Sequence, residues 1–249
     1  MTRVQGGVGM VLVGLLLGMG TPDARERGHE RCVECKVEFR FGAGPEGSWL
    51  TATSNGTTLE KRVGPSGLSI ELSARGDLVR VTATSSLSVT VERDGSLVTV
   101  QPNDVMADYA DGVARLLRHS AAVEGLERMV QSLRYSERPE ATSVTATFAL
   151  LRSLHGDSTG NTLLSQRVER RRTVSLATAA QNSRDGTTVV DCWLEYERSL
   201  NWSFERYSRC LRDYWWNQPV QYACGLEFAM VAELALFRVI SCSGGFPIG

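Results

Sequence analysis

The chain has 249 residues and a mass of 27.3 kDa, with 27 basic against 28 acidic side chains and 42% hydrophobic residues. This composition excludes a disordered or collagen-like chain. The formal charge of -1 gives no general electrostatic attraction to a nucleic acid. We therefore expect a folded protein of one large or two small domains that has no nucleic-acid partner.

The first twenty residues have the pattern of a secretory signal peptide. A polar start with one positive charge, Arg3, precedes an apolar stretch at 8–19, and small residues follow. As a helix this stretch would span about 18 Å, too little to cross a hydrocarbon core of about 30 Å. We predict a signal peptide over residues 1–20, cleaved after Gly20, and a secreted or periplasmic protein; an uncleaved tether is the alternative. The 25 arginines against two lysines suggest a GC-rich bacterial gene.

The six cysteines are expected to be paired in such a compartment. The short segment 21–35 carries Cys32 and Cys35 in a Cys-Val-Glu-Cys arrangement with redox spacing. It leads into a predicted strand, whereas redox cysteines usually lie at the amino terminus of a helix. We expect a local structural bridge between Cys32 and Cys35, with redox activity as the alternative.

Residues 36–102 are predicted to form an antiparallel sheet. A shift of nineteen residues aligns 68–81 with 87–100, and apolar residues alternate with polar ones in both segments. Gly76 and Gly95 separate the two apolar runs of each segment, which predicts two similar hairpins. Three further strands, at 36–41, 49–54 and 57–63, complete a meander of about seven strands.

The polar side of this predicted meander is rich in hydroxyl groups. Examples are Ser69, Ser73, Thr82, Ser88 and Thr90. A face of this kind can bind glycans or other polymers, but an ordinary solvated sheet face has the same composition.

Residues 103–172 are predicted to be helical. Apolar residues recur at steps of three and four over 106–117 and 123–133, with Ser120 as a cap between these helices. A third helix is predicted over 142–155, ending at Gly156. Asp104, Asp108 and Asp111 share a helical face, but acidic residues favour the first turns of helices, so no metal site is assigned.

A basic run consists of Arg167, Arg170, Arg171 and Arg172. It could contact acidic lipid headgroups or a partner, but cations are also common at helix ends.

The region 173–249 is predicted to form a disulfide-bonded helical hairpin. Facing positions of two antiparallel helices have a constant sum of residue numbers, and Cys192 with Cys242 gives the same sum, 434, as Cys210 with Cys224. A bridge from Cys192 to Cys210 would instead have to close about 27 Å of helix. We therefore predict the bridges Cys192–Cys242 and Cys210–Cys224 and a turn near position 217. In geometry alone this arrangement resembles the twin-cysteine helical hairpins of small disulfide proteins, which have shorter spacings.

Aromatic residues are dense in and beside the first helix of this hairpin. Trp215 and Trp216 fall in the turn, where we expect them to be exposed and available for binding. The second helix is apolar enough at 222–242 to suggest a membrane span, but Glu227, Glu233 and Arg238 interrupt it, so a buried helix is favoured.

The sequence contains no familiar catalytic or cofactor motif. His155, Asp157 and Ser158 have the residue types of a catalytic triad, but neighbouring residues in one loop rarely converge as a triad must. We predict an α+β protein with segregated sheet and helices, acting without cofactor as a non-enzymatic envelope or secreted protein that binds or scaffolds an envelope polymer or a protein. The alternatives are a membrane-active protein, acting through the aromatic-rich hairpin, and a motif-poor hydrolase acting on glycans.

Overall fold

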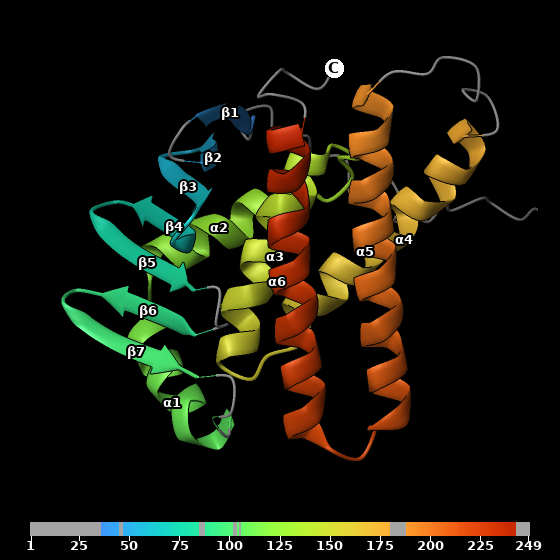
Figure 1. Ribbon diagram of the computed structural model, residues 1–249. Coiled ribbons are helices and arrows are strands. Elements are labelled where there is room, and N and C mark those ends of the chain that lie inside the picture. The colour runs from blue at the N-terminus through green and yellow to red at the C-terminus, as the bar shows by residue number, and fades with distance from the viewer. Residues whose placement is uncertain are drawn as a thin grey trace, which may run out of the picture. The chain divides into compact units, whose positions relative to one another are not determined.

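The computed structural model describes residues 36–44, 47–84, 88–101, 104, 106–179 and 188–242. Within these residues, seven strands precede six helices (Figure 1). The strands are β1 (Glu38–Gly44), β2 (Gly47–Ser54), β3 (Thr57–Gly64), β4 (Gly67–Ala74), β5 (Asp77–Ala83), β6 (Val89–Arg93) and β7 (Ser96–Val100). The helices are α1 (Met106–Leu117), α2 (Ala121–Ser132), α3 (Pro139–Leu154), α4 (Thr159–Ala179), α5 (Thr188–Asp213) and α6 (Gln218–Cys242). The predicted signal peptide, Cys32 and Cys35 lie outside the described residues.

The strands form one antiparallel sheet in chain order, β1 to β7, so the predicted meander is confirmed. The turns after β2, β4 and β6 each place two successive residues at positive φ: Asn55 and Gly56, Arg75 and Gly76, Asp94 and Gly95. Two positive φ angles in a two-residue connection are the signature of a type I′ hairpin turn. The hairpin of β2 and β3 therefore has the same turn geometry as the two hairpins predicted from the repeat, although its sequence does not match the repeat.

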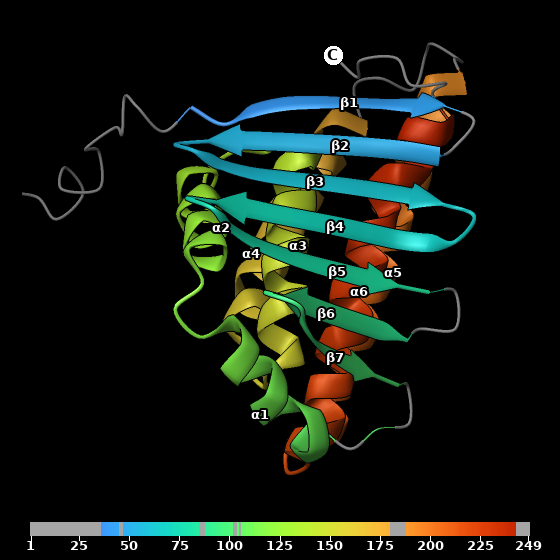
Figure 2. The same cartoon turned by 90° about the vertical axis from the view of Figure 1, so that its left-hand side faces the viewer.

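The six described helices lie on one face of the sheet, and no described element covers the other, which we call the open face (Figures 1 and 2). Helix α1 packs against β6 and β7, α2 against β3 to β5, and α6 against β1 and β2. Helices α4 and α5 pack on α3 and α6 and form an outer layer. The α+β prediction, with a sheet first and helices after it, is confirmed.

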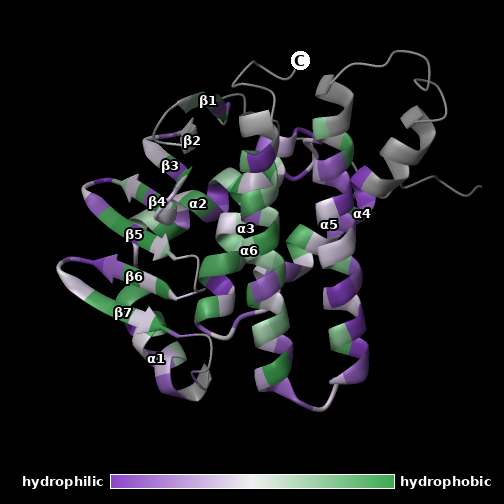
Figure 3. Ribbon diagram, in the orientation of Figure 1, coloured by the Kyte–Doolittle hydropathy of each residue, from purple (hydrophilic) through white to green (hydrophobic). Residues whose placement is uncertain are grey.

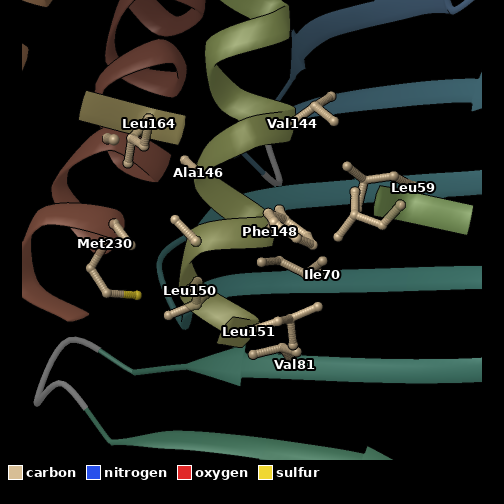
Figure 4. Close-up of a cluster of buried hydrophobic side chains, with 14 of the residues drawn as sticks. Leu59, Ile70, Val81, Val144, Ala146, Phe148, Leu150, Leu151, Leu164 and Met230 are labelled. Atoms are coloured by element: carbon tan, nitrogen blue, oxygen red, sulfur yellow. The ribbon is translucent and has the colours of Figure 1, made fainter. Parts of the chain in front are cut away.

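Helix α3 lies at the centre of the core, between the sheet and the outer helices. Almost all its side chains are buried, so no single apolar stripe is needed and its many small residues let neighbours approach on every side. Figure 4 shows two sets of contacts. Val144, Phe148 and Leu151 point to Leu59, Ile70 and Val81 of the sheet, whereas Ala146 and Leu150 lie on the side of Leu164 and Met230.

The predicted helix boundaries are close to those observed. Ser120 caps α2 by accepting a hydrogen bond from the backbone of Val123, as expected. Helix α3 begins at Pro139, three residues before the predicted start, because proline suits the first turn of a helix. Helix α4 begins inside the region 103–172 that was predicted to be helical, but its bounds were not predicted, since Leu164 and Val168 are buried but its other residues form no clear apolar stripe.

Helices α5 and α6 run side by side in opposite directions (Figure 1). The Cys210–Cys224 disulfide joins them near the turn, and Tyr207 stacks on Phe228 at 5.0 Å between ring centroids. The disulfide has the residue-number sum of 434 predicted from the cysteine spacing, and the stacked pair lies within one residue of it. The segment Gln218–Arg238 of α6 is long and apolar enough to cross a membrane, but half of it is buried in the fold, and Figure 3 shows α5 beside it as the more hydrophilic helix.

Candidate binding surface

A polar cluster lies inside the core, where β3, α3 and α6 meet. The ammonium group of Lys61 donates to the backbone oxygen of Ser143 at 2.7 Å, to its hydroxyl at 2.6 Å, and to the carboxylate of Glu233. The hydroxyl of Thr147 donates to the other oxygen of Glu233. Both charged side chains are completely buried. Glu233, expected as an interruption of an apolar helix, therefore has an ionic partner in the sheet.

The pairing of Lys61 with Ser143 has the residue types of a nucleophile and its base. Burial lowers the pKa of Lys61 and raises the pKa of Glu233, and their mutual attraction opposes both shifts. However, the residues of this cluster are all at most 1% exposed, so no substrate can reach the hydroxyl. The cluster connects β3 of the sheet with α3 and α6 through buried hydrogen bonds, and we assign it no catalytic role.

The loop after α3 holds His155, Asp157 and Ser158. Asp157 accepts hydrogen bonds from the guanidinium of Arg152 at 3.1 Å and from the backbone of Thr159 at 2.8 Å. Burial raises the pKa of Asp157, but these hydrogen bonds and the charge of Arg152 outweigh it and leave the pKa below its usual value. Burial also lowers the pKa of His155. The carboxylate thus caps the start of α4, and no hydrogen bond in the described part of the chain joins His155, Asp157 and Ser158 as a triad would require.

The basic run on α4 is directed at the connection between α2 and α3. Arg167 is buried and donates to the carbonyl oxygens of Leu133, at 2.6 Å, and Ser136. Burial lowers the pKa of Arg167 to about 10. Arg170 and Arg171 donate to two further carbonyl oxygens of the same connection. Three of the four arginines therefore satisfy backbone acceptors, and the side chain of Arg172 lies outside the described residues.

The turn of the helical hairpin presents the two tryptophans. Trp215 and Trp216 are 75% and 68% exposed, at the end of the hairpin that Cys210–Cys224 closes. Cys192 also takes part in a disulfide. The predicted partner, Cys242, has a side chain outside the described residues, so the pairing Cys192–Cys242 stays a prediction.

The open face of the sheet carries polar residues in rows that run across the strands. One row, which we call the hydroxyl row, follows from direct strand pairing. It contains Trp49 (β2), Arg62 (β3), Ser69 (β4), Thr82 (β5), Thr90 (β6) and Thr99 (β7). Adjacent strands are about 4.8 Å apart, so the row offers one side chain at each such step across six strands.

A neighbouring row carries charges of both signs. It consists of Arg40, Thr51, Glu60, Glu71, Arg80, Glu92 and Leu97. Arg80 pairs with Glu71 at 2.9 Å and with Glu92 at 3.7 Å. The acidic groups of this row are therefore partly neutralised within the sheet, and they lie beside the hydroxyl row along its middle.

A depression of about 530 Å³ lies at the Trp49 end of the hydroxyl row. Its floor is formed by the glycines at which β1 and β3 end and β2 and β4 begin. Its lining also includes Trp49, Arg62 and Ser69. Because glycine has no side chain, these strand ends leave a hollow beside the indole. The indole of Trp49 lies over Gly42, where an added Cβ would be 3.0 Å from the ring. Trp49 is 39% exposed, so the ring is supported on one side and accessible on another.

Arg62 is the basic side chain in the lining of the depression. It is exposed, lines the depression, and forms no ion pair with any carboxylate that the structure describes. An arginine fork in this condition can bind a carboxylate or phosphate through two parallel hydrogen bonds. The depression can thus offer an aromatic face, a cation and a hydroxyl to one ligand.

Trp49, Arg62 and the glycines were not predicted as a site. The strand containing Trp49 was predicted, and so was a hydroxyl-rich face, but the alignment of Trp49 with Arg62 depends on the register between β2 and β3. The sequence does contain one signal: Gly-Pro-x-Gly occurs at 44–47 and again at 64–67, and the glycines of both motifs line the depression.

No three side chains among His, Cys, Asp and Glu come together as metal ligands in the described part of the chain. Comparisons with known protein families, curated proteins and solved structures find no match to this chain.

Proposed function

We propose that this chain is an exported binding protein that holds an extended polyhydroxylated polymer, a glycan, on the open face of its sheet. The observation that carries the proposal is the hydroxyl row, which leads straight across the strands into the depression beside Trp49. An aromatic ring next to aligned hydroxyl groups can stack on a sugar ring and exchange hydrogen bonds with its hydroxyls.

Two further features support this proposal. The disulfide Cys210–Cys224 indicates an oxidising compartment outside the cytosol, where envelope and extracellular polymers occur. The polar groups that could act as nucleophile or acid in the described core are buried or engaged in structural hydrogen bonds. The proposed role is therefore binding, and the assay below also detects cleavage.

Sedimentation with insoluble bacterial cell-wall polymer tests this function. We expect the protein to sediment with the polymer. The triple variant Thr82→Glu, Thr90→Glu, Thr99→Glu should stay in solution, because the three glutamates replace hydroxyl groups and their larger side chains block the row. The variant Trp215→Ala, Trp216→Ala is the matched control and should sediment normally. Failure of the wild-type protein to sediment, or equal sedimentation of the triple variant, would contradict the proposal. Release of reducing sugars would favour the hydrolase.

A membrane-active role is the second candidate, supported by the exposure of Trp215 and Trp216 at the turn beside the Cys210–Cys224 disulfide. Tryptophan is favoured at the interface between membrane and water. Vesicles with anionic lipids should then shift tryptophan emission to shorter wavelength and leak their contents. Both responses should disappear in the Trp215→Ala, Trp216→Ala variant, while the triple threonine variant should retain them.

A further inference from the structure

We infer that the depression binds a sugar unit that carries a carboxylate, with the sugar ring against Trp49, the carboxylate on Arg62, and the rest of the glycan along the hydroxyl row. This inference rests on the proposed function and adds the class of glycan. It also gives the orientation of the bound glycan, since the sugar with the carboxylate lies at the β1 to β4 end of the sheet.

The shape of the depression favours one sugar unit at its Trp49 end. Its volume of about 530 Å³ lies in the range of sites for small ligands, about 300 to 1,000 Å³. The glycine floor brings the ligand close to the backbone of the strands, while the indole forms one side. The direct cross-strand pairing of Trp49 with Arg62 places the aromatic and the cationic group next to each other on one face.

The charges of the face select a ligand with few negative groups. Arg62 attracts a carboxylate at the depression, and its neighbour in the hydroxyl row on β4 is the neutral Ser69. The adjacent row holds three glutamates, Glu60, Glu71 and Glu92, against the two arginines Arg40 and Arg80. A polymer with a charge on every sugar would meet these glutamates along its length. A glycan with an isolated carboxylate gains the Arg62 contact without that repulsion.

Matched oligosaccharides test the inference. The probes are an array of envelope-type oligosaccharides, each carboxylated sugar beside its neutral counterpart, followed by calorimetric titration of the best-binding pair. We expect a glycan with one carboxylate to bind at least about tenfold more tightly than its neutral counterpart, since hydrogen bonds to charged groups are worth that much. Oligogalacturonate, which is charged on every sugar, should bind less well than the singly charged glycan.

Three variants locate the site. Arg62→Met should remove the preference for the carboxylate, whereas Arg40→Met, an exposed arginine on β1 outside the depression, should keep it. Trp49→Ala should weaken the charged and neutral glycans alike. Gly44→Leu should block both, because a Cβ at Gly44 meets no atom within 4 Å and its side chain can fill the hollow without disturbing the backbone.

Each result separates the two proposals. Equal binding of charged and neutral glycans, or equal effects of Arg62→Met and Arg40→Met, would overturn the inference about the carboxylate and leave the glycan-binding face standing. Binding that Gly44→Leu does not affect would also overturn the inference. If no oligosaccharide on the array binds, both the inference about the carboxylate and the proposed function are wrong. Thermal unfolding of each variant checks that the fold is intact.

Discussion

Lys61 and Arg62 are neighbours in β3 and have opposite surroundings. Lys61 points into the helix-covered face, is completely buried, and has an ionic partner and two further acceptors. Arg62 points to the open face, is exposed, and forms no ion pair within the described residues. One strand therefore places the same charge in two environments, because successive side chains alternate between faces. On the covered face the charge of Lys61 connects the sheet to two helices, whereas on the open face the charge of Arg62 is accessible to solvent.

The largest expected effect comes from breaking the buried pair. Lys61→Met leaves the carboxylate of Glu233 buried without its cation, which should lower the free energy of unfolding by about 3 to 5 kcal/mol. The double variant Lys61→Met, Glu233→Leu removes both charges and should recover most of the loss. Chemical denaturation of the two variants measures this. A double variant no more stable than the single one would show that the pair itself, and not the unpaired charge, supports the covered face.

Gly67 on the open face tests whether the glycine floor has a structural role of its own. Gly67 has φ +118, and an added Cβ would lie 2.1 Å from the carbonyl oxygen of Ala83. Gly67→Ala should therefore cost about 2 kcal/mol in unfolding free energy, from strained backbone and displacement of β5. Gly44→Ala, at the same floor, has open space and should be neutral in the same denaturation experiment. Equal costs would contradict this division between the two glycines.

Asp77 connects β5 to β6 and to the start of α2 on the helix-covered face, since it accepts hydrogen bonds from Arg93, Ser120 and the backbone of Ala122. Burial raises the pKa of Asp77, but these hydrogen bonds and the charge of Arg93 outweigh it, so the pKa lies below the usual 3.8. A lowered pKa contributes stability above 3.8 that is lost as pH falls through the folded-state value.

Asp77→Asn should therefore lower the free energy of unfolding by about 1 to 2 kcal/mol at pH 7. The difference from the wild-type protein should shrink as the pH falls below about 4 and through the lowered folded-state pKa, because the wild-type carboxyl group then becomes neutral, as the asparagine amide already is. Denaturation curves from pH 7 to pH 3 measure this. A difference that stays constant with pH would show that the charge of Asp77 is not what stabilises the contact.

The smallest effect is expected for Arg62 itself. Arg62→Met should change the unfolding free energy by less than about 0.5 kcal/mol, because the side chain is exposed and has no ionic partner among the described residues. The same denaturation experiment as for Lys61→Met gives a direct comparison of neighbouring positions. A loss of more than about 1 kcal/mol would mean that Arg62 has a structural role.

The sequence predicted the elements of the fold better than their spatial relations. Alternating apolar residues predicted the strands, and the cysteine numbering predicted the Cys210–Cys224 bridge, because both follow from local periodicity. The pairing of Lys61 with Glu233 could not be predicted, since the residues are 172 positions apart and no local pattern connects them. The alignment of Trp49 with Arg62 likewise needs the strand register, which the turn at Asn55 and Gly56 sets.

The ion pair between Lys61 and Glu233 has a consequence for how the chain reaches its folded state. Because the two residues are 172 positions apart in the sequence, the pair cannot form until the chain has been synthesised as far as α6. Contacts of such long sequence separation slow folding, since a large loop must close before they stabilise anything. Strand β3 and helix α6 should therefore acquire their final packing together, as a late step, and a chain truncated before α6 should not hold the sheet in its native state.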